Sequence, residues 1–151
     1  MSFDPIVQQL RLAVSPGQAF DVSTERIGEW WHPDYSANPA TFSGAVMEPR
    51  VGGRVYATHT DLGEVSWGEI IEWVPERRLA WAWTLAQDPA HPSLVEVAFE
   101  PEGDGSIVRF WHGGWTAENA GARSKFGDWP MLLARFATVA DGAQDRASGR
   151  R

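Results

Sequence analysis

Hydrophobic and polar positions alternate with a period of two between residues 6 and 112, a pattern typical of half-buried β-strands. The clearest case has Leu79, Trp81, Trp83 and Leu85 on one face and small residues on the other. The predicted strands are residues 6–14, 41–48, 54–60, 65–74, 79–86, 94–100 and 107–112. Short turn sequences join most of them at hairpin spacing. Because such turns do not allow parallel crossovers, we expect an antiparallel sheet of six to seven strands.

Two short helices are predicted directly after the first strand. Ser15 can cap a helix that has Pro16 at its first position. A second helix, from Glu25 to Trp31, must end before Pro33, because the residue before a proline is disfavoured in helical conformation. Two short helices are therefore expected between the first strand and the remaining strands.

The C-terminal part of the chain changes to a helical period. The apolar residues that recur at this spacing are Phe126, Trp129, Leu133, Phe136 and Ala140. Pro130 is tolerated only in a first turn or at a kink. The helix therefore either begins at an Asp128 cap, or begins near Ala117 and bends at Pro130.

The order of elements predicts a single α+β domain over residues 1–140. The apolar face of the C-terminal helix has to cover the concave face of a curved sheet, and a straight helix cannot touch such a sheet along its whole length. We therefore expect a gap between them. Residues 141–151 contain no apolar anchor and are expected to form a flexible tail.

Composition removes several classes of function. The chain has 151 residues, a net charge of −7 and no cysteine. The negative charge argues against a nucleic-acid groove, and the missing thiols exclude disulfides and thiolate zinc sites. Histidine spacing fits no metal motif, so we expect neither a metal nor a cofactor. Without a signal-peptide pattern or a long apolar run, we expect a cytoplasmic protein that does not insert into membranes.

Five short motifs resemble one known family. They are residues 30–33 (WWHP), the glycine pair 52–53, residues 68–79 (GEIIEWVPERRL), residues 105–114 (GSIVRFWHGG) and residues 127–133 (GDWPMLL). In this order they are similar to the Hsp90-ATPase-activator-homologue branch of the Bet v 1/START-like (SRPBCC) superfamily. The resemblance implies a helix-grip fold, in which a curved antiparallel sheet wraps around the C-terminal helix. It also implies an internal cavity, used by members of the superfamily for lipids, polyketides or partner proteins.

Candidate ligand-binding residues are those expected to face this cavity. They are Trp31, Trp67, Glu69, Trp81, Trp83, Val97, Phe99, Phe110, His112, Trp129 and Phe136. Nine tryptophans are unusual for this length and form either a bulky core or aromatic pocket walls. The aromatic stretch 30–35 should lie near the mouth, where it either gates the pocket or docks the second short helix.

Two candidates carry ionisable groups. His112 alternates in register with Val108 and Phe110, so it should point inward as a general base or as a structural histidine. Glu69 shares a face with Trp67 if that face is inward, and it would then need a raised pKa or a cationic partner. If the strand presents its other face, Glu69 is simply solvated.

Three functions remain open. The first is non-catalytic binding of an apolar, lipid-like or polyketide-like small molecule between the sheet and the C-terminal helix. The second is a protein-interaction module of the co-chaperone type, with a protein partner or a second copy of the chain. The third is a cyclase or hydrolase that uses a histidine and a glutamate of the pocket.

Overall fold

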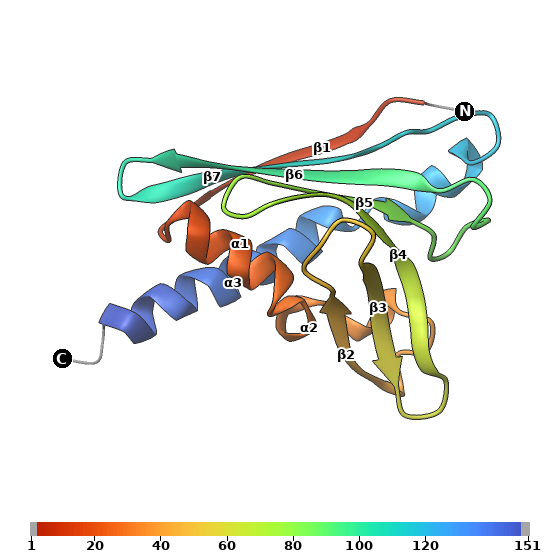
Figure 1. Cartoon of the computed structure of the whole chain (residues 1–151), viewed down its shortest axis with the longest axis horizontal. Helices are drawn as coiled ribbons and strands as arrows, with labels where there is room; N and C mark the ends of the chain where they lie inside the picture. Colours follow the sequence, from red (N-terminus) through yellow and green to blue (C-terminus); the bar gives the residue numbers. More distant parts are fainter. Residues whose placement is uncertain (1–2, 149–151) are drawn as a thin grey trace.

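One seven-stranded antiparallel sheet forms most of the computed structural model, which describes residues 3–148 and the side chains of residues 3–142 (Figure 1). The strands are β1 (Ile6–Leu12), β2 (Phe42–Met47), β3 (Arg54–His59), β4 (Gly63–Val74), β5 (Arg78–Trp83), β6 (Ser93–Glu102) and β7 (Gly105–Gly113). Their order across the sheet is β1-β7-β6-β5-β4-β3-β2, so sequential hairpins run from β2 to β7 and β1 joins at the edge. The predicted antiparallel sheet and the helix-grip fold are confirmed.

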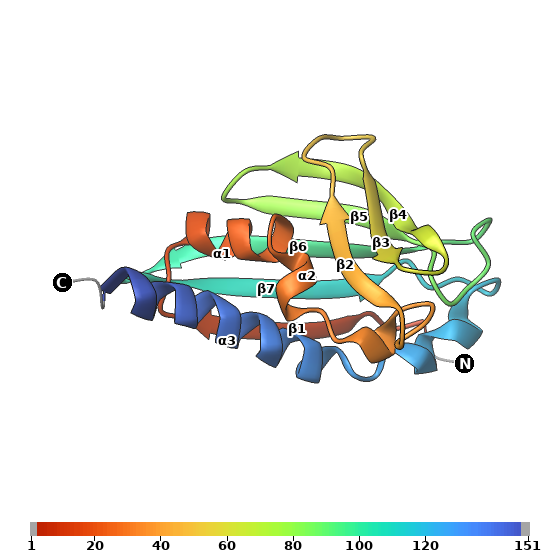
Figure 2. The same cartoon turned by 90° about the horizontal axis from the view of Figure 1, so that it is seen from below.

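The helices lie on the concave side of this sheet (Figure 2). They are α1 (Pro16–Thr24), α2 (Ile27–Trp30), the 3₁₀ helices η1 (Pro33–Tyr35) and η2 (Ala120–Phe126), and α3 (Trp129–Ser148). Ser15 caps α1 as predicted, because its Oγ accepts a hydrogen bond of 3.2 Å from the backbone N–H of Gln18. The second helix is shorter than expected at both ends. Among the described residues, none of the helices has both the length and the apolar composition needed to cross a membrane.

The C-terminal helix begins at Trp129, which supports the Asp128 start over the longer, bent helix. Pro130 occupies the second helical position, where its missing N–H costs nothing. The backbone carbonyl of Asp128 accepts hydrogen bonds from the N–H groups of Met131 and Leu132. The segment upstream is a separate 3₁₀ helix, η2, and Gly127 and Asp128 lie between it and α3.

The C-terminal tail predicted from residue 141 begins within this helix. Helical backbone continues to Ser148, and residues 149–151 lie outside the described part of the chain. Asp141 has a contact that the sequence does not reveal: its Oδ1 accepts a hydrogen bond of 3.1 Å from the backbone N–H of Ala13, between β1 and α1. Residue 140 is therefore not a boundary of secondary structure.

Strand β4 contains two bulges that break its alternation. Trp67 is an extra residue opposite β3, and Ile71 is an extra residue opposite β5. Each bulge changes which face the following side chains occupy. Trp67 and Ile70 are buried, whereas Glu69 is exposed. The expectation that Glu69 points inward with Trp67 is therefore wrong, because strict alternation does not hold across a bulge.

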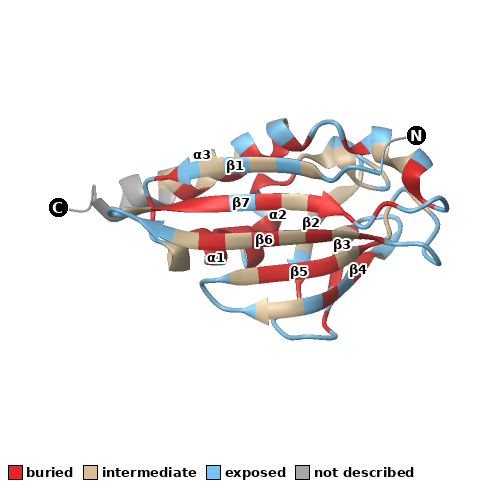
Figure 3. Ribbon diagram, turned by 90° about the horizontal axis from the view of Figure 1, so that it is seen from above, coloured by how far each residue is buried: buried red, intermediate tan, exposed pale blue. Residues whose placement is uncertain are grey.

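The core lies between the sheet and the three α-helices, and buried positions follow the middle strands (Figure 3). The helix α3 contributes Trp129, Leu132, Leu133, Phe136 and Ala140 to it. Aromatic contacts close the middle of this layer, with the ring centroids of Phe110 and Trp129 4.4 Å apart. At the end near η1 the layer is left open.

Candidate functional site

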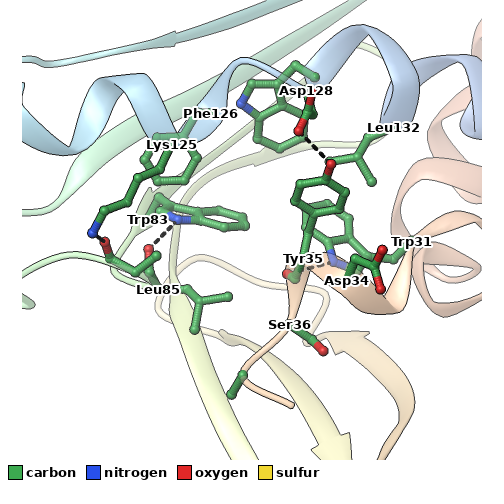
Figure 4. A pocket seen from close by; sticks show the side chains of 13 residues that line it. Trp31, Asp34, Tyr35, Ser36, Trp83, Leu85, Lys125, Phe126, Asp128 and Leu132 are labelled. Carbon is green, nitrogen blue, oxygen red and sulfur yellow. Dashed lines mark hydrogen bonds between the residues drawn. The ribbon is translucent and has the colours of Figure 1, made fainter. Parts of the chain in front are cut away.

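A cavity of about 280 Å³ lies at that open end, between η1, the β5–β6 loop and the junction of η2 with α3 (Figure 4). Its lining residues are Trp31, Asp34, Tyr35, Ser36, Ala37, Trp83, Leu85, Ala86, Lys125, Phe126, Asp128, Trp129 and Leu132. Their segments are distant in the sequence and meet because the sheet curls around the start of α3. It lies between the sheet and the first turn of α3, and its use as the predicted ligand cavity stays a prediction.

The floor of the cavity is apolar and aromatic. Trp31, Trp83 and Trp129 are each no more than 5 % exposed and approach one another with centroid separations of 5.7–5.9 Å. Phe126 contacts Trp83 edge-on at 5.9 Å. Rings at these separations make favourable offset or edge contacts, so the floor is closely packed and apolar.

The rim of the cavity is polar and exposed. Tyr35 donates a hydrogen bond of 2.5 Å from its hydroxyl to Asp128 Oδ2, which joins η1 to the start of α3. This hydrogen bond to a carboxylate raises the pKa of Tyr35 above its usual range. On the other side, Lys125 Nζ donates to the backbone carbonyl of Ala86 at 2.8 Å. The rim is thus held by two polar contacts between different elements.

Two of the three indole N–H groups of the floor are occupied by nearby backbone. Trp31 Nε1 donates to the carbonyl of Tyr35 at 3.1 Å, and Trp83 Nε1 donates to that of Leu85 at 2.8 Å. Trp31 and Trp83 therefore also fix rim segments. Ala86, next in the chain, has a φ of +66°, which is unusual for a residue with a Cβ and shows how tightly the β5–β6 loop turns at the rim.

His112 points inward as predicted, but it lies behind the floor of the cavity. It is fully buried and contacts Trp83, Phe126 and Trp129. Trp129 Nε1 donates to its Nδ1 at 3.0 Å, so Nδ1 carries no proton and Nε2–H donates to Ser93 Oγ at 2.7 Å. Both ring nitrogens are therefore occupied within the core.

The electrostatic state of His112 agrees with this arrangement. Burial lowers its pKa to about 3, with a smaller contribution from the positive charge of Arg123. The ring is neutral at physiological pH, and its two hydrogen bonds join α3 to strand β6. The structural interpretation of His112 is thus favoured over the general-base interpretation.

Some of the other candidate residues lie in the floor of the cavity, and the rest lie in the packed core. Trp31, Trp83 and Trp129 line the cavity. Four others surround a small void of about 20 Å³ in the packed core, which has room for little more than one water: Trp81, Val97, Phe110 and Phe136. Trp67 lies against Trp31 at 4.6 Å, and Phe99 lies against Phe20 at 5.3 Å. Whether any of these residues binds a ligand stays a prediction.

Sequence reasoning missed most of the rim. Lys125 lies in the 3₁₀ helix η2 and Asp128 follows it, and neither belongs to a periodic pattern that would show which way its side chain points. The signal that was present is the aromatic stretch 30–35, which indicates the mouth of the pocket. Its partner across the rim is 93 residues away in the chain, a distance that no local pattern bridges.

A family model described as "Activator of Hsp90 ATPase homolog 1-like protein" matches residues 13–141. The chain belongs to this family. The match covers strands β2 to β7 and most of helix α3, and it confirms the resemblance found in the motifs. Among the curated proteins, none matches the chain.

Several solved structures are similar to this chain over nearly its whole length. Txn09, an anthrahydroquino-γ-pyrone synthase complexed with a ligand abbreviated SUM, is 32 % identical with a TM-score of 0.65, over 92 % of this chain and 99 % of its own. MLL2253 from Mesorhizobium loti is 22 % identical with a TM-score of 0.67, over 95 % and 98 %. The Aha1 dimer from Colwellia psychrerythraea is 15 % identical with a TM-score of 0.66, over 91 % and 96 %. The last two likenesses show the fold alone.

Proposed function

We propose that this protein binds a planar, largely apolar aromatic molecule in the cavity beside η1. The observation that carries the proposal is the floor of three buried tryptophans and Phe126 under an exposed polar rim. Ligand pockets usually combine apolar walls with a few polar groups that orient the ligand. At about 280 Å³ the cavity lies at the small end of such pockets, which suits two or three fused rings better than a long acyl chain.

The relationship to Txn09 supports the same class of ligand. That protein is described as a synthase of an anthrahydroquino-γ-pyrone, a fused aromatic compound, and is 32 % identical over 92 % of this chain. The aromatic floor offers apolar contacts of the kind that such rings make. A binder of this kind would act in the cytoplasm, the location that the sequence predicts.

Saturable quenching of tryptophan fluorescence tests this proposal. Three of the nine tryptophans line the cavity, so we expect anthraquinone to quench emission with a stoichiometry of one. Replacing Ala37, an exposed residue that lines the cavity, by phenylalanine should fill part of the space and weaken binding by roughly tenfold, which corresponds to about 1.4 kcal/mol.

A neighbouring alanine provides the control. Ala40 is exposed in the same loop but is not among the lining residues, so Ala40→Phe should leave the dissociation constant unchanged. Equal effects of the two substitutions would show that quenching does not report the cavity. Linear quenching without saturation would reject the binding proposal itself.

A second candidate is a cyclase or synthase activity on such a ligand, and the relationship to Txn09 favours it. The groups first considered for acid–base chemistry do not reach the cavity, since His112 is enclosed in the core and Glu69 is exposed elsewhere. Tyr35 and Asp128 at the rim would have to serve instead. Mass spectrometry of reactions with aromatic polyketide substrates tests this, with Asp128→Asn as the inactive control.

The co-chaperone function rests on the family description and on the fold shared with the Colwellia Aha1 dimer. A purified sample that stimulates the ATPase of an Hsp90 would support it. Association with a second copy of the chain is tested separately by sedimentation velocity. Neither result alters the test of the cavity, because both experiments measure protein–protein association and not binding of a small molecule.

A further inference from the structure

The polar groups around the cavity differ between its two sides. Asp34, Tyr35 and Asp128 lie on one side, and Lys125 lies on the other, with the ring of Trp83 between them (Figure 4). Lys125 is the only lysine in the chain. A ligand that lies on the aromatic floor would therefore meet oxygen atoms at one edge and an ammonium group at the opposite edge.

The oxygen side offers hydrogen-bond acceptors. The one proton of the Tyr35 hydroxyl is donated to Asp128 Oδ2 at 2.5 Å, so its lone pairs remain for a ligand. The carboxylates of Asp34 and Asp128 are acceptors when ionised. A polar group of the ligand at this edge must therefore be a donor, such as a neutral hydroxyl.

The lysine side offers donors. An ammonium group carries three N–H donors, and one of them is directed to the carbonyl of Ala86. The contact with Ala86 holds Nζ at the rim, where the remaining donors can meet a carbonyl oxygen. Because a charged donor forms stronger hydrogen bonds than a neutral one, this contact adds orientation as well as affinity.

Resting on the binding proposal above, we propose that the cavity selects aromatic ligands with a neutral hydroxyl at one edge and a carbonyl at the opposite edge. The hydroxyl donates to Tyr35 Oη or Asp128, and the carbonyl accepts from Lys125 Nζ. A hydroxyquinone has this arrangement. The two sides of the rim fix which way round the ring system lies on the floor.

Ionisation of the ligand hydroxyl should remove its favourable contact with Tyr35 and Asp128. The charged groups around Tyr35 Oη are the carboxylates of Asp34 and Asp128 and, on the far side of the cavity, Lys125; His32 lies beside Tyr35 with its ring centroid 6.0 Å away. A phenolate at this edge would face two carboxylates without a proton to share. Affinity should therefore fall as the pH rises through the pKa of the ligand hydroxyl.

Two probes with the same ring system test the proposal in the intact protein. 2-Hydroxyanthraquinone carries the hydroxyl and both carbonyls, whereas anthraquinone carries the carbonyls only. Tyr35→Phe also removes the rim contact with Asp128, so it is read as a difference between the probes: it should weaken 2-hydroxyanthraquinone roughly tenfold more than anthraquinone, the value of one hydrogen bond to a charge-linked group. Lys125→Met should weaken both probes alike, because both have a carbonyl for the ammonium.

The pH dependence of the affinity is tested with Asp128→Asn. In the wild type, the affinity for 2-hydroxyanthraquinone should drop as its hydroxyl ionises, and Asp128→Asn should reduce this drop because one of the facing carboxylates is gone. Glu69→Gln removes an exposed carboxylate outside the cavity and serves as the control. Anthraquinone, which does not ionise, should show no such drop with any variant.

The outcomes separate this inference from the proposal on which it rests. If anthraquinone quenches saturably but Tyr35→Phe affects both probes equally, or neither, the donor–acceptor selection is overturned and the binding proposal stands. If neither probe binds the wild type, the binding proposal fails first. Circular dichroism checks that each variant is folded, and if Tyr35→Phe is not, the Asp128→Asn pH profile decides alone.

Discussion

His112 shows how much of the core depends on one neutral polar residue. Its ring accepts from Trp129 and donates to Ser93, so helix α3 is joined to strand β6 by a chain of two hydrogen bonds. Gln87 extends this chain, donating from Nε2 to Ser93 Oγ at 2.8 Å. A buried polar group is costly unless it is satisfied in this way. The same residue type at the same place in a pocket wall would be read as a catalytic base, and only its partners distinguish the two roles.

Protonation of His112 should make the protein acid-sensitive. Its pKa is about 3 in the folded protein and about 6.5 when unfolded, so the unfolded chain binds more protons between these values. Stability is therefore fully present above pH 6.5 and falls as the pH is lowered toward 3. Between pH 6.5 and 5 this one group should remove about 1.5 kcal/mol of unfolding free energy, measured by urea denaturation.

The comparison that isolates this group is His112→Gln. Glutamine keeps polar atoms near Trp129 and Ser93 but does not titrate. The variant should be less stable at pH 7 and should lose about 1.5 kcal/mol less than the wild type between pH 6.5 and 5. Parallel pH profiles for the two proteins would contradict the assignment of the acid sensitivity to His112.

At the scale of elements, the sequence correctly predicted which way side chains face in strands with regular alternation. It failed where a single extra residue interrupts the alternation. Strand β5 alternates without interruption, and its large side chains face the core as expected. Strand β4 does not, because Trp67 and Ile71 are bulged. A bulge is defined by the pairing with the neighbouring strands. The face on which Glu69 lies could therefore not be predicted from the sequence of its own strand alone.

Gly68 is the residue on which the first bulge depends. Its φ is +152°, and an added Cβ would lie 1.6 Å from the carbonyl oxygen of Ala82 on β5. Gly68→Ala must therefore separate β4 from β5 or shift their register. We expect a loss of at least 3 kcal/mol in unfolding free energy, the upper end of backbone strain with a steric clash added.

Gly127→Ala is the matched control for this loss. Gly127 has a φ of −72°, and nothing lies within 4 Å of an added Cβ. The substitution should change the unfolding free energy by less than about 0.5 kcal/mol. A Gly68→Ala protein as stable as Gly127→Ala would mean that the bulge is not needed for pairing.

The cavity itself was predictable only in outline. Bulky residues on both the sheet and the helix imply that the two are held apart, and the structure shows that space at one end. The middle of the layer is instead filled, since Phe110 and Trp129 meet at 4.4 Å. Which end stays open depends on how Tyr35 and Asp128 meet across the rim, a long-range contact absent from any sequence period.

At the scale of the whole molecule, the cavity and the closure of the fold lie at different ends of α3. The cavity is lined by the first turn of the helix, through Trp129 and Leu132. Further along, α3 lies beside α1 and β1, where Ala140 is fully buried (Figures 1 and 2). Stability contributed by the far end of the helix should therefore be separable from affinity for the ligand.

Two C-terminal truncations test this separation. A chain that ends at Gly142 keeps Ala140 in the core and the hydrogen bond from Ala13 N–H to Asp141. A chain that ends at Val139 loses both, about 2 kcal/mol for a buried methyl group and one hydrogen bond, or roughly 4–8 °C in melting temperature. The chain that ends at Val139 should melt lower than the chain that ends at Gly142 by this amount. Both should bind anthraquinone with the full-length dissociation constant below their melting temperatures, because no residue of the cavity is removed. Weaker binding by the shorter chain while it is still folded would show that the far end of α3 also holds the cavity in shape.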